Sequence, residues 1–195
     1  MKALEKFLSK HSFTLLLIWC FVLTILYSTL SIVRHMHFQS GGFDLGLYDQ
    51  AVWKFGHFLG AYNTVKGRII FGDHMVLTLP IFGVLYYFWN DVRLLLVMQA
   101  GAIVFSAIPI FLIAKRRLSS KIAALCIAGM YSLFYGIQYG VYFDFHPILI
   151  GVAILSWLAY LWESEKKTLF WITFVIALAT QENMGIAVAR LAALF

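Results

Sequence analysis

The sequence predicts an all-α, polytopic membrane protein, and its composition and its long apolar runs both indicate this class. Hydrophobic residues make up 62% of the chain and charged residues 12%, with a mean hydropathy of +0.85. A soluble domain has about 45–50% apolar and about 25% charged residues. Several apolar runs have the length of about 20 residues that a helix needs to cross a bilayer. We therefore expect a single transmembrane domain over 1–195 with about five transmembrane helices.

The expected spans are, in chain order, 13–33, 92–114, 122–140, 144–163 and 168–188. The first follows a basic start, and its apolar stretch exceeds the core of about 7–15 residues found in cleaved signal peptides, so we predict an uncleaved signal anchor. A sixth apolar stretch, 75–89, would reach only about 22 Å as a helix, against a hydrocarbon core about 30 Å thick. We expect this stretch to lie in the interface or to be re-entrant.

The basic residues predict the orientation. If 75–89 does not cross, the N-terminal lysines, the 115–121 cluster and Lys166–Lys167 fall on one side. Basic residues concentrate in cytoplasmic loops, which predicts a cytoplasmic N-terminus in the plasma membrane and an outer loop over 34–91. The same bias accounts for the net charge of +6, so we expect no nucleic-acid partner.

The outer loop is expected to carry two juxtamembrane helices, 44–59 and 75–89. Over 44–59 the apolar residues recur at i, i+3/i+4 and i+7, the pattern of an amphipathic helix lying on the membrane. Gly41 and Gly42 would form the turn before it, and Asp44 has the position and side chain of an N-cap.

Four polar clusters interrupt the apolar sequence, and the expected topology brings all of them to the outer side: 41–50, 71–75, 143–147 and 180–183. Acids at such depths are costly and are usually retained for function. Asp44 is the catalytic candidate, because a carboxylate at the water–lipid boundary can accept a proton from a hydroxyl; helix capping explains it equally well. Asp49, about 140° around the helix, is either substrate-binding or merely solvated.

Two acid–histidine pairs stand at the mouths of apolar stretches: Asp73–His74 and Asp144–His146. Pro147 fits a helix start that Asp144 would cap. The functional alternative is that Asp144 and His146 bind a divalent cation, Mg²⁺ or Mn²⁺, while His74 binds substrate phosphate.

Glu182 is expected within the outer third of the last span, where an ionisable group requires a partner. It either forms a structural pair, with His146, Arg34 or Arg93 as the candidate partner, or lines a substrate cavity. Arg93 is also a candidate substrate-binding residue. Gln99, nearer the middle of its span, is expected to make a helix–helix hydrogen bond.

The polar clusters also carry a family resemblance. FDLGLYDQAVW (43–53), GDHMVLTLPIFG (72–83), IAKRRL (113–118), DFHP (144–147) and TQEN (180–183) resemble, in the same order, a family of prokaryotic membrane proteins catalogued as domain of unknown function 2079. That family is similar to the membrane-embedded, C-type glycosyltransferases that use lipid-phosphate-linked sugars. The family's last motif usually has a lysine before the glutamate and an acid after it, where this chain has Gln181 and Asn183.

The resemblance implies a polyprenyl-phosphate sugar as donor, Asp44 as the acid that activates the acceptor, and His74, Asp144, His146 and Glu182 around the donor phosphate. Family members are about twice as long, so we expect this chain to be either an inactive N-terminal part of the fold, completed by further helices or another subunit, or a shortened protein. Membrane lipid is the other expected partner. The alternatives are a transporter or ion-conducting subunit with Glu182 as the ion site, or a non-catalytic membrane scaffold.

Overall fold

The computed structural model describes residues 2–193 and is almost entirely helical. Its helices are α1 (Lys2–Met36), α2 (Leu47–Gly56), α3 (Leu79–Leu85), α4 (Arg93–Phe105), α5 (Ala107–Arg117), α6 (Lys121–Ser132), α7 (Tyr135–Tyr142), α8 (Pro147–Glu163), α9 (Lys167–Thr180) and α10 (Met184–Ala192). A short π-helix (Gly42–Gly46) precedes α2, and a 3₁₀ turn (Ile70–Gly72) precedes α3. The only strands among the described residues, β1 (Tyr62–Asn63) and β2 (Arg68–Ile69), form an antiparallel hairpin that pairs Tyr62 with Ile69.

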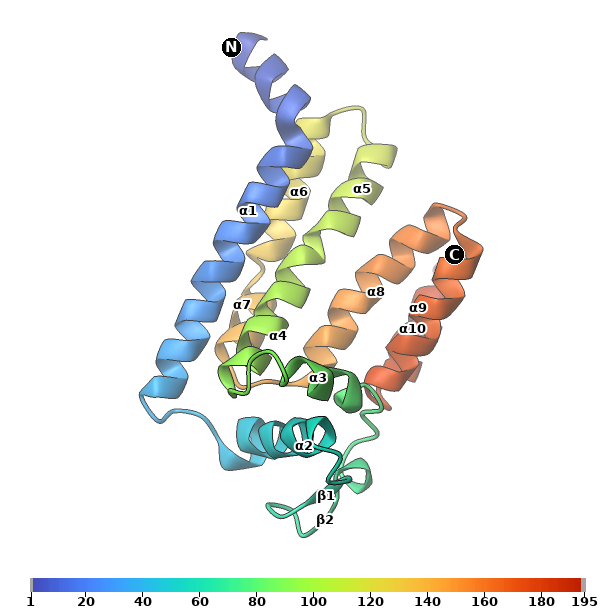
Figure 1. Cartoon of the computed structure of the whole chain (residues 1–195). Coiled ribbons are helices and arrows are strands. Elements are labelled where there is room, and N and C mark those ends of the chain that lie inside the picture. The colour runs from blue at the N-terminus through green and yellow to red at the C-terminus, as the bar shows by residue number, and fades with distance from the viewer. Residues whose placement is uncertain (1, 194–195) are drawn as a thin grey trace.

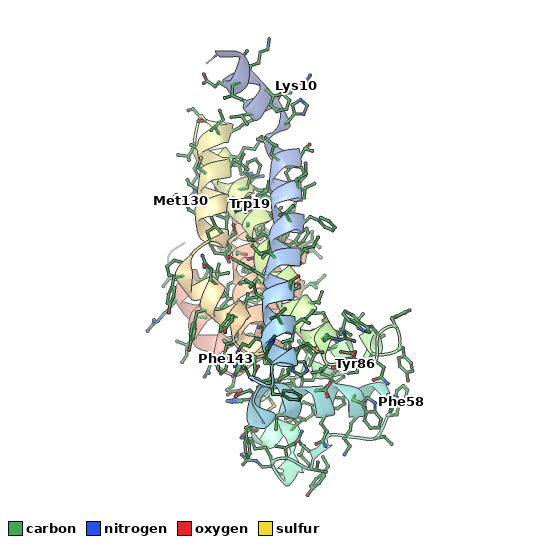
Figure 2. All side chains as sticks on the ribbon, turned by 90° about the vertical axis from the view of Figure 1, so that its left-hand side faces the viewer. Lys10, Trp19, Phe58, Tyr86, Met130 and Phe143 are labelled. Carbon is green, nitrogen blue, oxygen red and sulfur yellow. The ribbon has the colours of Figure 1, made fainter. Side chains whose placement is uncertain are left out.

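The long helices run side by side, and α2, α3 and the β-hairpin gather at one end of them (Figure 1). We call this the α2–α3 end; the opposite end carries the start of α1 and the α5–α6 and α8–α9 connections. Figure 2 places Lys10 at the opposite end and Phe58 and Tyr86 at the α2–α3 end. The stretch 75–89 therefore does not run along the bundle, because only its seven-residue helix α3 is regular and it lies beside α2.

Within residues 2–193, two helical segments are long and apolar enough to cross a membrane: Ala3–Met36, and Arg93–Arg117, which comprises α4 and α5. A third span results if α6 and α7, bent by 42° at their junction, count as one. The apolar helices α8 and α9 are shorter, so the expected count of five spans stays a prediction. Large apolar side chains are exposed along α1, as expected for a face that contacts lipid: Phe21, Val22, Ile25 and Leu26.

The expectation of one continuous last span over 168–188 is wrong. Helix α9 ends at Thr180, Gln181 is extended (φ −169°, ψ 152°), and α10 starts only at Met184. Figure 1 shows α10 returning beside α9, so the polar TQEN cluster lies at the turn between two antiparallel helices. Glu182 consequently lies at the α2–α3 end and not inside a helix.

The α2–α3 end has a hydrophobic core of its own. Leu47, Tyr48 and Val52 of α2 pack with Leu79 of α3 and with Phe145, which is fully buried at the junction between α7 and α8. Helices α2 and α3 cross at two glycines, where a Cβ on Gly83 would lie 2.7 Å from the Gly56 nitrogen. This packing holds the loop residues against the ends of the long helices and fixes where the polar clusters meet.

Candidate functional site

The side chain of Asp144 is the buried anchor of the α2–α3 end. It is 1% exposed, and its Oδ1 lies 2.6 Å from Nη1 of Arg34, which comes from the last turn of α1. The backbone N–H of Gly41 donates to the other oxygen, Oδ2, at 2.6 Å. The Arg34 guanidinium also lies over the rings of Tyr142 and Phe143. A buried charge needs such compensation, so Asp144 joins α1, the Gly41 turn and the α7–α8 junction.

Gln99 of α4 fixes the α7–α8 junction from the other side. Its Nε2 donates to the carbonyl oxygens of Gly140 and Asp144, both at 3.3 Å, and its Oε1 accepts from the backbone N–H of His146 at 2.7 Å. Gln99 is fully buried, and the expected helix–helix hydrogen bond is thus present. These bonds set the position from which the His146 ring projects.

His146 and Asp44 form a partly exposed imidazole–carboxylate pair. Nε2 of His146 lies 3.4 Å from Oδ1 of Asp44, and the two side chains are 31% and 38% exposed. Nδ1 of the same ring lies 3.0 Å from the carbonyl oxygen of Asp144. Since a carbonyl oxygen can only accept, Nδ1 carries a proton and Nε2 is left to exchange one with Asp44. The pair is therefore arranged for proton transfer at the solvent boundary.

Neither acid caps a helix as expected. Asp44 lies within the π-helix, whose N-cap position is Gly41, and no side-chain capping bond forms there. Pro147 does stand in the first turn of α8, but His146 and not Asp144 occupies its N-cap position. The capping explanation for Asp44 is therefore wrong, and its carboxylate remains directed at His146.

The side chains of Asp144 and His146 do not form the predicted cation site. Both Asp144 oxygens are occupied, by the Arg34 guanidinium and by the Gly41 N–H. Across residues 2–193, no group of three or more His, Cys, Asp or Glu side chains is arranged to hold a metal ion. In the structure Asp144 acts as a buried anchor that pairs with Arg34, and His146 acts as the partner of Asp44.

Glu182 pairs with His74, and not with any of the three partners expected for it, His146, Arg34 and Arg93. Its Oε1 lies 2.7 Å from Nδ1 of His74, and its Oε2 accepts from the backbone N–H of Met75 at 3.0 Å. The bond from His74 is the largest of the effects that hold the pKa of Glu182 below its usual range. Both side chains are more than 40% exposed, so this contact joins the α9–α10 turn to the 74–75 segment at the surface.

Two basic residues of the β-hairpin region lie next to the site. Lys66 Nζ and Arg68 Nη2 contact Oδ1 of Asp73, at 3.2 and 2.9 Å. The Lys66 ammonium also lies 5.5 Å from the ring centre of Phe43, the residue before Asp44. Positive charge thus lies beside the ring of Phe43, the residue that precedes Asp44 in the chain.

Tyr48 is a buried tyrosine whose pKa is affected by several acids at the α2–α3 end. Its side chain is buried, with its ring edge-on to Phe145 and His146. Burial, followed by the negative charges of Asp73, Glu182 and Asp44, raises the pKa of Tyr48 to about 12. The sequence pattern placed Tyr48 on the apolar face of its helix, which is correct, but gave no sign that three acids would act on its pKa.

Asp49 and Arg93 belong to a second polar group. The Tyr86 hydroxyl donates to Asp49 at 2.7 Å, and Arg93 forms a bidentate pair with Asp91 two residues away. Burial raises the pKa of Asp49. Neither Asp49 nor Arg93 makes a hydrogen bond or ion pair with Asp44, His146 or Glu182 within the described chain, so their predicted substrate-binding roles have no contact with this site.

This geometry defines the class of the protein. It is a helical membrane protein with a polar site at one end of its helix bundle. Residues 34–195 match the model of a family of predicted membrane proteins, domain of unknown function 2079, and the chain belongs to that family. Comparison with curated proteins and with solved structures finds no match.

Proposed function

We propose that the α2–α3 end is the site of a membrane glycosyltransferase-like protein that takes its sugar from a polyprenyl-phosphate donor. The observation that carries the proposal is the Asp44–His146 pair, partly exposed to solvent and held by a buried framework. A transferase needs a base at the acceptor hydroxyl, and a carboxylate backed by an imidazole supplies one. The apolar helices beside the site suit a donor that reaches it through the bilayer.

In the proposed reaction the acceptor hydroxyl oxygen attacks the anomeric carbon of the sugar. The bond from that carbon to the phosphate oxygen breaks, the hydroxyl proton passes to Asp44, and polyprenyl phosphate leaves with the bonding electron pair. In this proposal Lys66 and Arg68, which share Asp73 as their carboxylate partner, would offset the negative charge of the departing phosphate. The attack from the face opposite the phosphate inverts the anomeric centre.

The proposed orientation places this end outside the plasma membrane. Its support is the distribution of basic residues. The opposite end of the bundle carries five of them: Lys115, Arg116, Arg117, Lys166 and Lys167. A transporter based on Glu182 has less support, because Glu182 lies at the bundle end beside His74 and not along a path through it.

The test is sugar transfer in proteoliposomes supplied with a labelled polyprenyl-phosphate sugar. Asp44→Asn keeps the shape of the side chain but removes the base, and we expect it to lower the transfer rate by about 100-fold or more. Asp91→Asn is the matched control, because Asp91 is a carboxylate at the same end that is paired with Arg93. Transfer by Asp44→Asn at the rate of the unsubstituted protein would overturn the assignment.

A further inference from the structure

A second candidate site lies at the opposite end of the bundle, far along the helices from Asp44. It is a cavity of about 560 Å³ between the end of α5 and the α8–α9 connection. Its wall is largely apolar and aromatic, with Leu161, Trp162, Phe170 and Trp171. That volume lies within the range of about 300–1,000 Å³ typical of small-molecule sites.

The side chains that line this cavity include equal numbers of positive and negative charges. Two cations line it, Arg117 and Lys167, and two carboxylates, Glu163 and Glu165. Glu163 accepts from Nε of Arg117 at 3.1 Å, so its charge is already compensated and the terminal guanidinium nitrogens of Arg117 remain able to donate. Within residues 2–193 the Lys167 ammonium and the Glu165 carboxylate have no hydrogen-bond or ion-pair partner.

Glu165 is held at the cavity by an uncommon backbone conformation. Its φ of 55° lies in the left-handed region, which a glutamate seldom adopts. The turn itself is closed by backbone bonds, including Lys166 N–H to the Leu161 carbonyl at 3.1 Å. A glycine would make this turn with less strain, whereas the glutamate places a carboxylate in the lining of the cavity.

The position of the cavity indicates what fills it. The cavity lies where two apolar helices, α8 and α9, end and are connected, and Trp162 and Trp171 flank it. Tryptophan is enriched at the level of the lipid headgroups. A ligand here would have its polar part among Arg117, Lys167 and Glu165 and its apolar part against Phe170 and Trp171.

We propose that this cavity binds an ethanolamine phospholipid. Arg117 and Lys167 would bind the phosphate, as basic groups between membrane helices commonly do. The free Glu165 carboxylate would accept hydrogen bonds from the primary ammonium of the headgroup. A choline headgroup has no N–H to donate, and a glycerol headgroup has no positive charge, so both match the balanced charges less well. The proposal does not depend on sugar transfer at the other end.

The experiment is a titration of the purified, detergent-solubilised protein with phospholipids of identical acyl chains, followed by native mass spectrometry. The headgroups compared are ethanolamine, choline and glycerol. We expect the ethanolamine lipid to bind tightest. Glu165→Gln should weaken its binding about fivefold, as one partly exposed charge pair allows, and leave the glycerol lipid unaffected or bound more tightly. Lys167→Gln should weaken both, because both lipids carry the phosphate.

Lys121→Gln is the matched control, since Lys121 is an exposed lysine at the same end that does not line the cavity. It should bind each lipid like the unsubstituted protein. Equal or tighter binding of the glycerol or choline lipid would overturn the ethanolamine assignment. Binding that is the same in Glu165→Gln, Lys167→Gln and Lys121→Gln would show that this cavity holds no headgroup.

Discussion

Arg34 and Asp144 form an ion pair of 2.6 Å between residues 110 positions apart in the sequence, with side chains only 13% and 1% exposed. The pair joins the end of α1 to the α7–α8 junction, directly behind the Asp44–His146 pair. Together with the Gly41 N–H it makes a rigid frame for the exposed groups. This frame stabilises the fold and positions Asp44 and His146, the two residues to which we assign the proposed chemistry.

Asp144→Asn should strongly destabilise the protein, because it leaves the Arg34 guanidinium without its charged partner. Removing one member of a buried ion pair typically costs about 3–5 kcal/mol. Thermal unfolding in detergent measures the effect. The double variant Arg34→Met/Asp144→Asn should lose less than the two single losses added together. Arg93→Met, which breaks the exposed pair with Asp91, should change the unfolding temperature far less.

Gly83→Ala should push helices α2 and α3 apart. The added Cβ would lie 2.7 Å from the Gly56 nitrogen and 3.1 Å from the Phe55 carbonyl carbon, and backbone cannot yield as a flexible side chain does. We expect a loss of about 1–3 kcal/mol in the free energy of unfolding. Gly46→Ala serves as the control, because its Cβ would have no atom within 4 Å and its φ of −65° suits alanine. Equal stability of the two variants would contradict the close crossing.

Asp49→Asn should change stability in a pH-dependent way. Burial raises the pKa of Asp49 in the folded protein, so its contribution to stability is fully present below about pH 4 and is lost as the pH rises through the folded pKa. The asparagine cannot ionise, and its amide oxygen can still accept from the Tyr86 hydroxyl. The unfolding free energy of the variant, relative to the unsubstituted protein, should therefore increase as the pH rises above about 4 and level off above the folded pKa of Asp49.

Asp91→Asn should change the free energy of unfolding with pH in the opposite direction to Asp49→Asn. The hydrogen bond from Arg93 lowers the pKa of Asp91, so its contribution to stability is present above about pH 4 and is lost in acid. The Asp91 variant should lose stability relative to the unsubstituted protein as the pH rises from 3 to 5. A difference independent of pH for Asp49→Asn would show that Asp49 is not buried as described.

Several elements were predictable because they depend on local properties. The stretch 75–89 is too short to cross, and the structure keeps it beside α2. Pro147 indicated the start of α8, and Gln99 the hydrogen bond between helices. The break at Gln181 was missed because TQEN follows an apolar run without the proline or glycine that usually marks a helix end, and the turn is formed by contacts with the distant residues His74 and Met75.

The sequence by itself determined that this is a helical membrane protein with its acids and histidines grouped at helix ends, because apolar length and charge placement are properties of the chain alone. Only the tertiary structure decided the pairing: Asp144 with Arg34, Glu182 with His74, and Asp44 with His146. The first two pairs join residues 110 and 108 positions apart in the chain, and the third is similarly distant. Spacing along one helix carries no information about such contacts, which depend on how α1, the α2–α3 loops and the α7–α8 and α9–α10 junctions pack at one end of the bundle.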